Sequence, residues 1–365
     1  MKRLAVLLTM FTLLLTTPAL AHPAHARSAH TRSSPPAPGG VGGRPVVFPF
    51  DTFAHAGVGV EWWYFVGHLA DDAGHTYGFE TTFFRFGGLR RYGSPIDTFY
   101  RTDVAITDEA RRRFHHTVVY TPSLPPVTVA STSTLRLRAG ALDVSTLGPL
   151  RYHIHGTLPA GAVDLTVAAQ RPPMLVNNGF IGWGAGYSYY YSLTHMLTTG
   201  TLTIGARRIA VHGVTWNDHQ WGDMGGSSVK GWQWMALQLS DGTDLSLANE
   251  RPSAAPYATW AQALLPDNTQ RYVRTAIITP LASWRSPATR TTYPAVWHVR
   301  APRLGLDVVV RPTIPDQEVT DTGFLGFKIS YWEGSCTVSG TRNGHPVSGK
   351  AYVELTGYDT ASAVP

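Results

Sequence analysis

The feature that most limits the possible folds is a repeated pattern of short alternating segments that end at tight turns. Aromatic and β-branched residues alternate with polar ones over residues 60–69 and 76–86, and the sequence DDAG at 71–74 suits a hairpin turn between them. The same pattern recurs over 231–249 and 331–356. No long stretch has helical periodicity. The pattern therefore predicts an all-β chain built from antiparallel hairpins.

The composition excludes several other classes of protein. The chain has 365 residues, of which 15% are charged and 11% are aromatic, and it has a single cysteine. Charged residues usually make up roughly 25% of a globular protein, and so few charges with so many rings exclude a disordered chain or a coiled coil. One cysteine excludes a disulfide framework, a cysteine-based zinc site and an iron–sulfur cluster.

The net charge of +6 comes mostly from the N-terminal end of the chain. Residues 1–21 have a basic start, an apolar run and a small-x-small cleavage signal, which predicts a signal peptide and a secreted, extracellular protein. Residues 22–44 are rich in Ala, His, Pro, Ser and Gly, which predicts a disordered linker. These first 44 residues hold five Lys and Arg and no acid, so the remainder carries only +1. We therefore expect no nucleic-acid partner, and no later run of about 20 apolar residues predicts a transmembrane span.

Two Trp-led hairpins suggest that the folded part contains a duplicated unit. They begin at EWW (61–63) and WQW (232–234), and the glycine-rich sequence DMGGSS at 223–228 lies between them. We expect an N-terminal domain over 45–224 and a C-terminal domain over 225–365. Many short antiparallel strands in each half predict two β-barrel domains packed together, and about eight strands enclose room for one small ligand.

The densest group of polar and aromatic residues is WNDHQW at 216–221. Strand alternation divides it between two faces, with Asn217, His219 and Trp221 on one and Trp216, Asp218 and Gln220 on the other. A histidine beside an indole ring can exchange a proton near a developing cation, because the ring face attracts positive charge. The alternative is a structural corner in which Asp218 caps a turn and the rings fill the core.

Glu61 is a second candidate acid. Alternation places it on one face with Trp63 and Phe65, and a carboxyl group in an aromatic interior is expected to have a raised pKa. The alternative is an ion pair with Arg85 on the neighbouring strand. A similar choice applies to Tyr189, which lies in a ladder of alternate tyrosines that either lines a pocket or fills the core.

Several catalytic motifs are absent from the sequence. It contains no nucleophile elbow, no HExxH, no phosphate loop and no dinucleotide fingerprint. His153 and His155 share a strand face, but no carboxylate follows at a suitable spacing. We therefore expect no metal and no cofactor.

Seven strings carry a resemblance to a known family: EWWYFVGHL (61–69), GFETTFFR (78–85), YSYYYSLT (187–194), GVTWNDHQWG (213–222), GWQWMALQLSDG (231–242), YWEGS (331–335) and YVELTGY (352–358). They resemble the lipocalin-like family of AttH proteins and carotenoid 1,2-hydratases, also called hydroxyneurosporene synthases. The resemblance covers about residues 48–358. It implies two lipocalin-like antiparallel β-barrel domains side by side, and a hydrophobic small-molecule ligand.

The resemblance also implies a chemistry. Hydratases of this family add water to the terminal alkene of an acyclic carotenoid without a cofactor, by protonation, stabilisation of a carbocation and capture by water. Their His-x-Trp motif corresponds to His219 and Trp221. Their Tyr-x-Asp pair is missing here, where residues 245–250 read LSLANE and Glu250 is the nearest acid.

The leading hypothesis is a secreted, cofactor-free hydro-lyase of the carotenoid hydratase type that acts on a polyene or terpenoid. Its candidate catalytic residues are His219, Asp218, Glu61 and Glu250. Its candidate substrate-binding residues are Trp221, Trp216, Trp63, Trp234, Tyr189 and Asn217. The alternatives are a pericyclase or isomerase of a natural-product pathway, in which the cavity holds one substrate conformation, and a non-catalytic carrier of lipophilic ligands.

Overall fold

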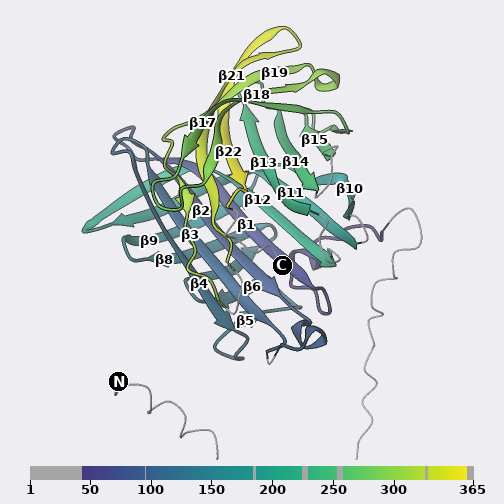
Figure 1. Ribbon diagram of the computed structural model, residues 1–365, viewed down its shortest axis with the longest axis vertical. Helices are drawn as coiled ribbons and strands as arrows, with labels where there is room; N and C mark the ends of the chain where they lie inside the picture. The colour runs from purple at the N-terminus through teal and green to yellow at the C-terminus, as the bar shows by residue number, and fades with distance from the viewer. Residues whose placement is uncertain are drawn as a thin grey trace, which may run out of the picture. The chain divides into compact units, whose positions relative to one another are not determined.

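The computed structural model describes residues 43–94, 96–183, 186–223, 229–252, 258–324 and 328–359. These residues form antiparallel β-strands and three short 3-10 helices, Phe50–Thr52, Leu89–Tyr92 and Pro302–Leu304, with no α-helix among them (Figure 1). The expected all-β class is confirmed. No helix in the described ranges is long and apolar enough to cross a membrane. The expected signal peptide (1–21) and nearly all of the expected linker (22–44) lie outside the described residues.

The first sheet has twelve strands, in the order β4-β3-β2-β1-β12-β11-β9-β8-β7-β6-β5, with β10 paired to β11. Its strands are β1 (Val60–Ala70), β2 (Thr76–Phe86), β3 (Phe99–Asp108), β4 (Arg113–Pro122), β5 (Val129–Ala130), β6 (Arg136–Ala139), β7 (Leu142–Gly148), β8 (Arg151–Leu158), β9 (Gly161–Ala169), β10 (Met174–Trp183), β11 (Gly186–Ile204) and β12 (Arg207–Asp223). Because β12 returns to pair with β1, the two strands lie in the middle of the sheet.

The second sheet has ten strands, in the order β16-β15-β14-β13-β22-β21-β19-β18-β17, with β20 paired to β21. Its strands are β13 (Val229–Leu239), β14 (Asp244–Pro252), β15 (Ala258–Leu264), β16 (Gln270–Val273), β17 (Ile277–Arg285), β18 (Thr292–Ala301), β19 (Leu306–Pro312), β20 (Glu318–Val319), β21 (Tyr331–Arg342) and β22 (His345–Leu355). The change from one sheet to the other falls at residues 224–228, which are not described. The predicted boundary at 224/225 therefore stays a prediction.

Local turn chemistry explains the three predicted hairpins, β1–β2, β13–β14 and β21–β22, all of which form. In the first turn, Gly74 has a φ of +82°, and Asp71 accepts hydrogen bonds from the backbone N–H groups of Ala73 and His75 at 3.0 and 2.9 Å. In the third turn, Asn343 and Gly344 both have positive φ, which is the requirement of a two-residue type I′ hairpin.

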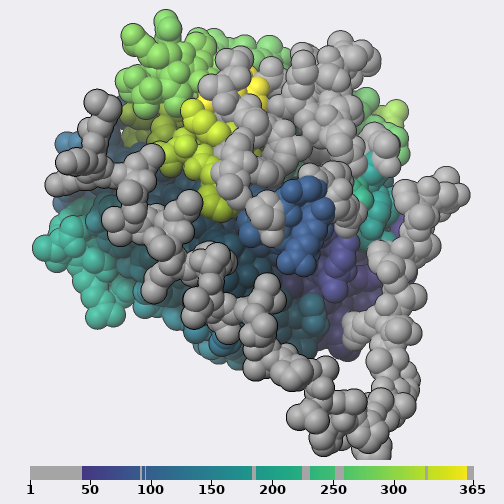
Figure 2. Space-filling view, turned by 60° about the horizontal axis from the view of Figure 1, so that its bottom comes forward, coloured from purple at the N-terminus to yellow at the C-terminus, as the bar shows by residue number. Residues whose placement is uncertain are grey.

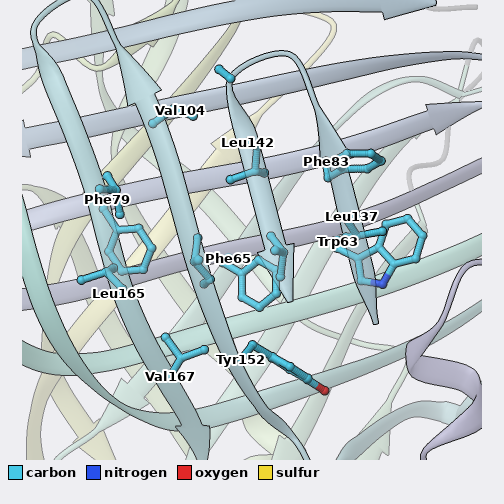
Figure 3. Packing of buried hydrophobic residues seen from close by; sticks show 14 of the residues in the cluster. Trp63, Phe65, Phe79, Phe83, Val104, Leu137, Leu142, Tyr152, Leu165 and Val167 are labelled. Atoms are coloured by element: carbon cyan, nitrogen blue, oxygen red, sulfur yellow. The ribbon is translucent and has the colours of Figure 1, made fainter. Parts of the chain in front are cut away.

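Buried apolar residues gather in three groups. One lies inside the first sheet around Trp63, Phe65 and Leu165 (Figure 3), and a second lies inside the second sheet around Trp297. The third joins residues of both sheets, among them Trp216 of β12. Consequently the two central strands of the first sheet are covered on both faces, by their own core and by the second sheet. Figure 2 shows the green and yellow residues of the second sheet directly against the blue and teal residues of the first.

Candidate functional site

The two faces of β12 lead to two different groups of polar residues. As the alternation predicts, Trp221 and His219 lie in the interior of the first sheet, whereas Asp218 and Gln220 face the second sheet and line a cavity there. Trp216 packs in the apolar group shared by both sheets. Neighbouring residues of one strand therefore belong to separate sites.

The cavity between the sheets has a volume of about 50 Å³. Its aromatic lining comes from both sheets: Trp62, Tyr64, Phe84 and Tyr190 from the first, and Trp232, Trp234 and Trp260 from the second. Its other residues are Ile181, Asp218, Gln220, Ala248, Glu250 and Glu354. The arrangement places three carboxyl groups against aromatic rings.

Each of the three carboxyl groups accepts a hydrogen bond from an indole N–H: Asp218 from Trp216 at 2.6 Å, Glu250 from Trp260 at 3.1 Å and Glu354 from Trp232 at 2.8 Å. Asp218 is the most fully engaged of them. It also accepts hydrogen bonds from the hydroxyls of Ser192, at 2.6 Å, and Tyr190. In contrast, no hydrogen bond from the described residues reaches Oε1 of Glu354.

Burial makes these groups weaker acids than usual. It raises the pKa of Asp218 to about 7 and that of Glu354 to about 7, although their hydrogen bonds act in the opposite direction. Burial also raises the pKa of Glu250, against the hydrogen bond from Trp260. At neutral pH, a substantial fraction of Asp218 and Glu354 therefore carries a proton that can be donated.

The second polar group lies inside the first sheet and is centred on Glu61. Oε1 of Glu61 is 3.0 Å from Nε2 of His219 and 2.7 Å from Nδ1 of His55. The His55 ring stacks on Trp221, with centroids 4.1 Å apart, and the His219 ring stacks on Trp63 at 4.5 Å. Glu61 and His219 are completely buried.

The expectation of a raised pKa for Glu61 is wrong. Burial does favour the neutral form, but hydrogen bonds and charge from His219 and His55 outweigh it and lower the pKa. The alternative partner, Arg85, is also present, with Nη1 3.5 Å from Oε2. Burial lowers the pKa of His219 despite its bond to Glu61. The group is thus a carboxylate held by cationic and hydrogen-bonding neighbours, and Glu61 is a poor proton donor.

The structure places the ten predicted site residues in two regions, the interior of the first sheet and the space between the two sheets. Six belong to its interior: His219, Glu61, Trp221, Trp63, Tyr189 and Asn217. Tyr189 stacks on Trp221 at 5.3 Å, and the side chain of Asn217 donates to the backbone oxygen of Tyr64. The other four line or support the cavity: Asp218, Glu250, Trp234 and Trp216. A single site that combines His219 with Trp234 is therefore not formed.

Sequence reasoning missed two residues that complete these groups. Glu354 is an acid inside the apolar strand β22, and its position in YVEL was the only available signal. His55 lies in the irregular segment before β1, where no strand pattern marks it.

Comparisons with known proteins agree with this architecture. A family model described as AttH-like matches residues 40–358. A protein of Nitrosomonas europaea assigned as AttH is 27% identical in sequence, with a TM-score of 0.76 over 87% of this chain and 98% of its own. Kievitone hydratase from Nectria haematococca is 20% identical, with a TM-score of 0.71 over 87% and 94% of the two chains. The structure of CghA with Sch210972 is 13% identical, with a TM-score of 0.50 over 82% and 88%. A search of curated proteins finds no match.

Proposed function

Because the chain belongs to the AttH-like family, we propose that it is a cofactor-free hydratase that adds water to a carbon–carbon double bond in the cavity between its two sheets. The observation that carries this proposal is the set of three indole-bound carboxyl groups, two with a pKa of about 7, among aromatic rings. The fold likeness to a protein named as a hydratase supports the reaction type.

Glu354 is the proton donor in this proposal. It lines the cavity, its Oε2 is fixed by the Trp232 N–H, and no hydrogen bond from the part of the chain that the structure describes reaches its Oε1. The proton passes from Glu354 to the terminal carbon of the alkene, and the π electrons form the new C–H bond. The positive charge is left on the more substituted carbon, where the faces of Trp62 and Trp234 stabilise it.

Water then captures the cation and returns a proton to the Glu354 carboxylate, so the group ends the cycle as it began. Gln220 is suited to orient this water, because its amide N–H donates to Ser188 at 2.8 Å and none of the described residues donates to its carbonyl oxygen, which can accept from water. Asp218 is a positioning residue, because it accepts hydrogen bonds from Tyr190 of the cavity wall and from Ser192 and Trp216 behind it. His219 and Trp221 lie on the opposite face of β12, in the interior of the first sheet, and take no part in the reaction.

The substrate class follows from the size and chemistry of the cavity. A volume of about 50 Å³ is far below the roughly 300–1,000 Å³ of sites that enclose a drug-sized ligand. It admits the reacting end of a longer molecule, and the aromatic lining favours an apolar, unsaturated end such as that of an acyclic terpenoid or carotenoid. We further propose that residues 1–21 direct export, so that the reaction takes place outside the cell.

The test is incubation of the purified protein with a panel of acyclic terpenoids and carotenoids in H₂¹⁸O, followed by mass spectrometry. We expect one ¹⁸O atom in the product, and we expect Glu354→Gln to lower the rate by about 10²–10⁴-fold. The matched control is Glu318→Gln, another buried carboxyl group, which is bound by Tyr293 and does not line the cavity. The wild-type rate should fall above about pH 7 as Glu354 loses its proton.

Two outcomes would reject the proposal. Ligand binding detected by tryptophan quenching, without product from any substrate, would identify a carrier. An isomerised or cyclised product without ¹⁸O, formed equally by Glu354→Gln, would identify an enzyme that acts through the shape of the cavity.

A further inference from the structure

The Glu61 group has no part in the proposed hydration, yet its geometry is that of a metal-binding site. We propose that His55, Glu61 and His219 bind one divalent transition-metal ion of the Zn²⁺ or Fe²⁺ type inside the first sheet. Each of the three residues offers one ligand atom, and these atoms all lie within 4.8 Å of one another; Oε1 of Glu61 faces Nδ1 of His55 and Nε2 of His219. The site would be separate from the cavity, because His219 and Asp218 lie on opposite faces of β12.

Strand pairing brings two of the ligands together. Trp221 pairs with Glu61, and His219 pairs with Trp63, so Glu61 and His219 are diagonal neighbours on the inner face of β1 and β12. His55 is added by the segment before β1, and its backbone N–H donates to Glu61 Oε2 at 3.0 Å. Three ligands thus come from positions that the fold holds independently.

The donor atoms need to move very little to accept an ion. Ligand atoms about 2.0–2.2 Å from a metal, at bond angles of 90–109°, are roughly 2.9–3.5 Å apart. The observed separations from Glu61 Oε1 are 2.7 Å to His55 Nδ1 and 3.0 Å to His219 Nε2. For these two pairs, a shift of a few tenths of an ångström is therefore enough to reach coordination distances, and the three ligand atoms lie within 4.8 Å of one another.

The outer partners of the two histidines are already in place. A metal-bound histidine usually donates its other ring N–H to a carboxylate or another acceptor, which fixes the tautomer and the ring orientation. His55 Nε2 lies 3.0 Å from Asp51 Oδ1, and His219 Nδ1 lies 3.3 Å from the hydroxyl oxygen of Tyr191. Both far nitrogens are occupied, so the near nitrogens are the ones directed at Glu61.

The carboxylates also favour a cation at this point. Both nitrogens of the His55 ring face carboxylate oxygens, one from Asp51 and one from Glu61. The Arg85 guanidinium lies 3.5 Å from Oε2 of Glu61, which leaves Oε1 for the ion. Glu61 would therefore bind through one oxygen while the other keeps its protein contacts.

The donor set defines the class of ion. Two imidazoles and one carboxylate suit Zn²⁺ and Fe²⁺, whereas Mg²⁺ and Ca²⁺ prefer oxygen ligands only. No further His, Cys, Asp or Glu of the described ranges joins the three ligands, so a coordination position remains for water. The His55 side chain is 15% exposed and the other two are fully buried, so an ion would enter from the His55 side.

The experiment is calorimetric titration of the full chain with ZnCl₂, after chelator treatment and without a polyhistidine tag. We expect one ion per chain, and we expect His219→Ala and Glu61→Gln each to weaken binding by about 100-fold or more. Because these buried substitutions endanger folding, Asp51→Asn provides an independent test. It removes the charged outer acceptor and no ligand, and it should weaken binding by about 10–100-fold.

Two controls separate this site from other histidines. A variant with alanine at His22, His25 and His30 removes the histidines of the N-terminal tail, and His153→Ala removes an exposed histidine that pairs with Asp164. Both should bind as the wild type does. The wild-type chain with Co²⁺ should also show visible d–d absorption that Asp51→Asn shifts or weakens.

Absence of stoichiometric binding would overturn the proposal. So would binding that the tail variant abolishes, or binding that folded Glu61→Gln and Asp51→Asn chains retain in full. Because hydration is assayed without added metal, failure of the metal site leaves the hydratase proposal standing, and failure of hydration leaves the metal titration unaffected.

Discussion

Glu80 makes the stability of the contact between the two sheets dependent on pH. It lies on β2 and is fully buried, and its Oε1 accepts hydrogen bonds from Thr82 at 2.7 Å and from the hydroxyl of Tyr331, on β21, at 2.8 Å. The same Tyr331 hydroxyl is 2.7 Å from Asp103. Burial, followed by the charge of Asp103, raises the pKa of Glu80 to about 8. Glu80 is therefore mostly protonated in the folded chain at neutral pH.

The sign and size of the effect follow from linkage. The pKa of Glu80 is about 8 in the folded chain, against the ordinary glutamate value of 4.5 in the unfolded chain. The folded pKa is the higher one, so the stabilisation is complete below pH 4.5 and is lost as the pH rises through 8. Each unit in this window costs about 1.4 kcal/mol, so the loss between pH 5 and pH 8 is roughly 3–4 kcal/mol.

The assay is urea unfolding of the wild type and Glu80→Gln at pH 5, 6, 7 and 8. Glutamine keeps the shape of the side chain but has no proton to lose, so wild-type stability should fall relative to the variant by that amount. Asp143→Asn is the control. Hydrogen bonds from Arg136 and Arg138 outweigh the effect of burial and lower the pKa of Asp143, so this residue is charged in both the folded and the unfolded chain above pH 5. The difference in unfolding free energy between the wild type and Asp143→Asn should therefore not change with pH. The reasoning would be refuted if the unfolding free energy of the wild type, relative to that of Glu80→Gln, stayed constant or increased between pH 5 and pH 8.

Three further substitutions, one of them with a matched control, test the packing. Gly213→Ala on β12 places a Cβ 2.1 Å from the backbone oxygen of His68 and should lower the melting temperature clearly, whereas Gly182→Ala meets nothing within 4 Å and should not. Leu247→Ala removes a fully buried side chain from the second core and should cost about 2–5 kcal/mol in urea unfolding. Trp234→Phe loses the indole N–H that donates to Tyr190 at 2.9 Å and Ser246 at 3.1 Å. It should lower the free energy of unfolding by roughly 1–2 kcal/mol and weaken ligand binding measured by fluorescence. An unchanged stability would show that water replaces these hydrogen bonds.

The features that could be predicted from the sequence are those that depend on residues close together in the chain. The turn at Asp71–Gly74 and the division of β12 between two faces follow from local chemistry and from the two-residue period of a strand, and both are confirmed. The two-residue period predicts that His219 and Asp218 lie on opposite faces of the strand, but it does not predict which residues each side chain contacts. That is decided by pairing between residues far apart in the chain.

The wrong prediction for the pKa of Glu61 arose because the local pattern does not show which distant residues contact this carboxyl group. An aromatic strand face predicts a desolvated acid, and desolvation is indeed the largest influence on its pKa. The reversal comes from His219, 158 positions away, and from His55, which lies in no strand at all. The acid with the properties expected of Glu61 is instead Glu354, whose partner Trp232 is 122 positions away. A period-two pattern identifies buried acids, but whether such an acid keeps its proton depends on the donors that the tertiary fold brings to it. The pKa values of Glu61 and Glu354 are therefore set by the pairing of strands β1, β12, β13 and β22.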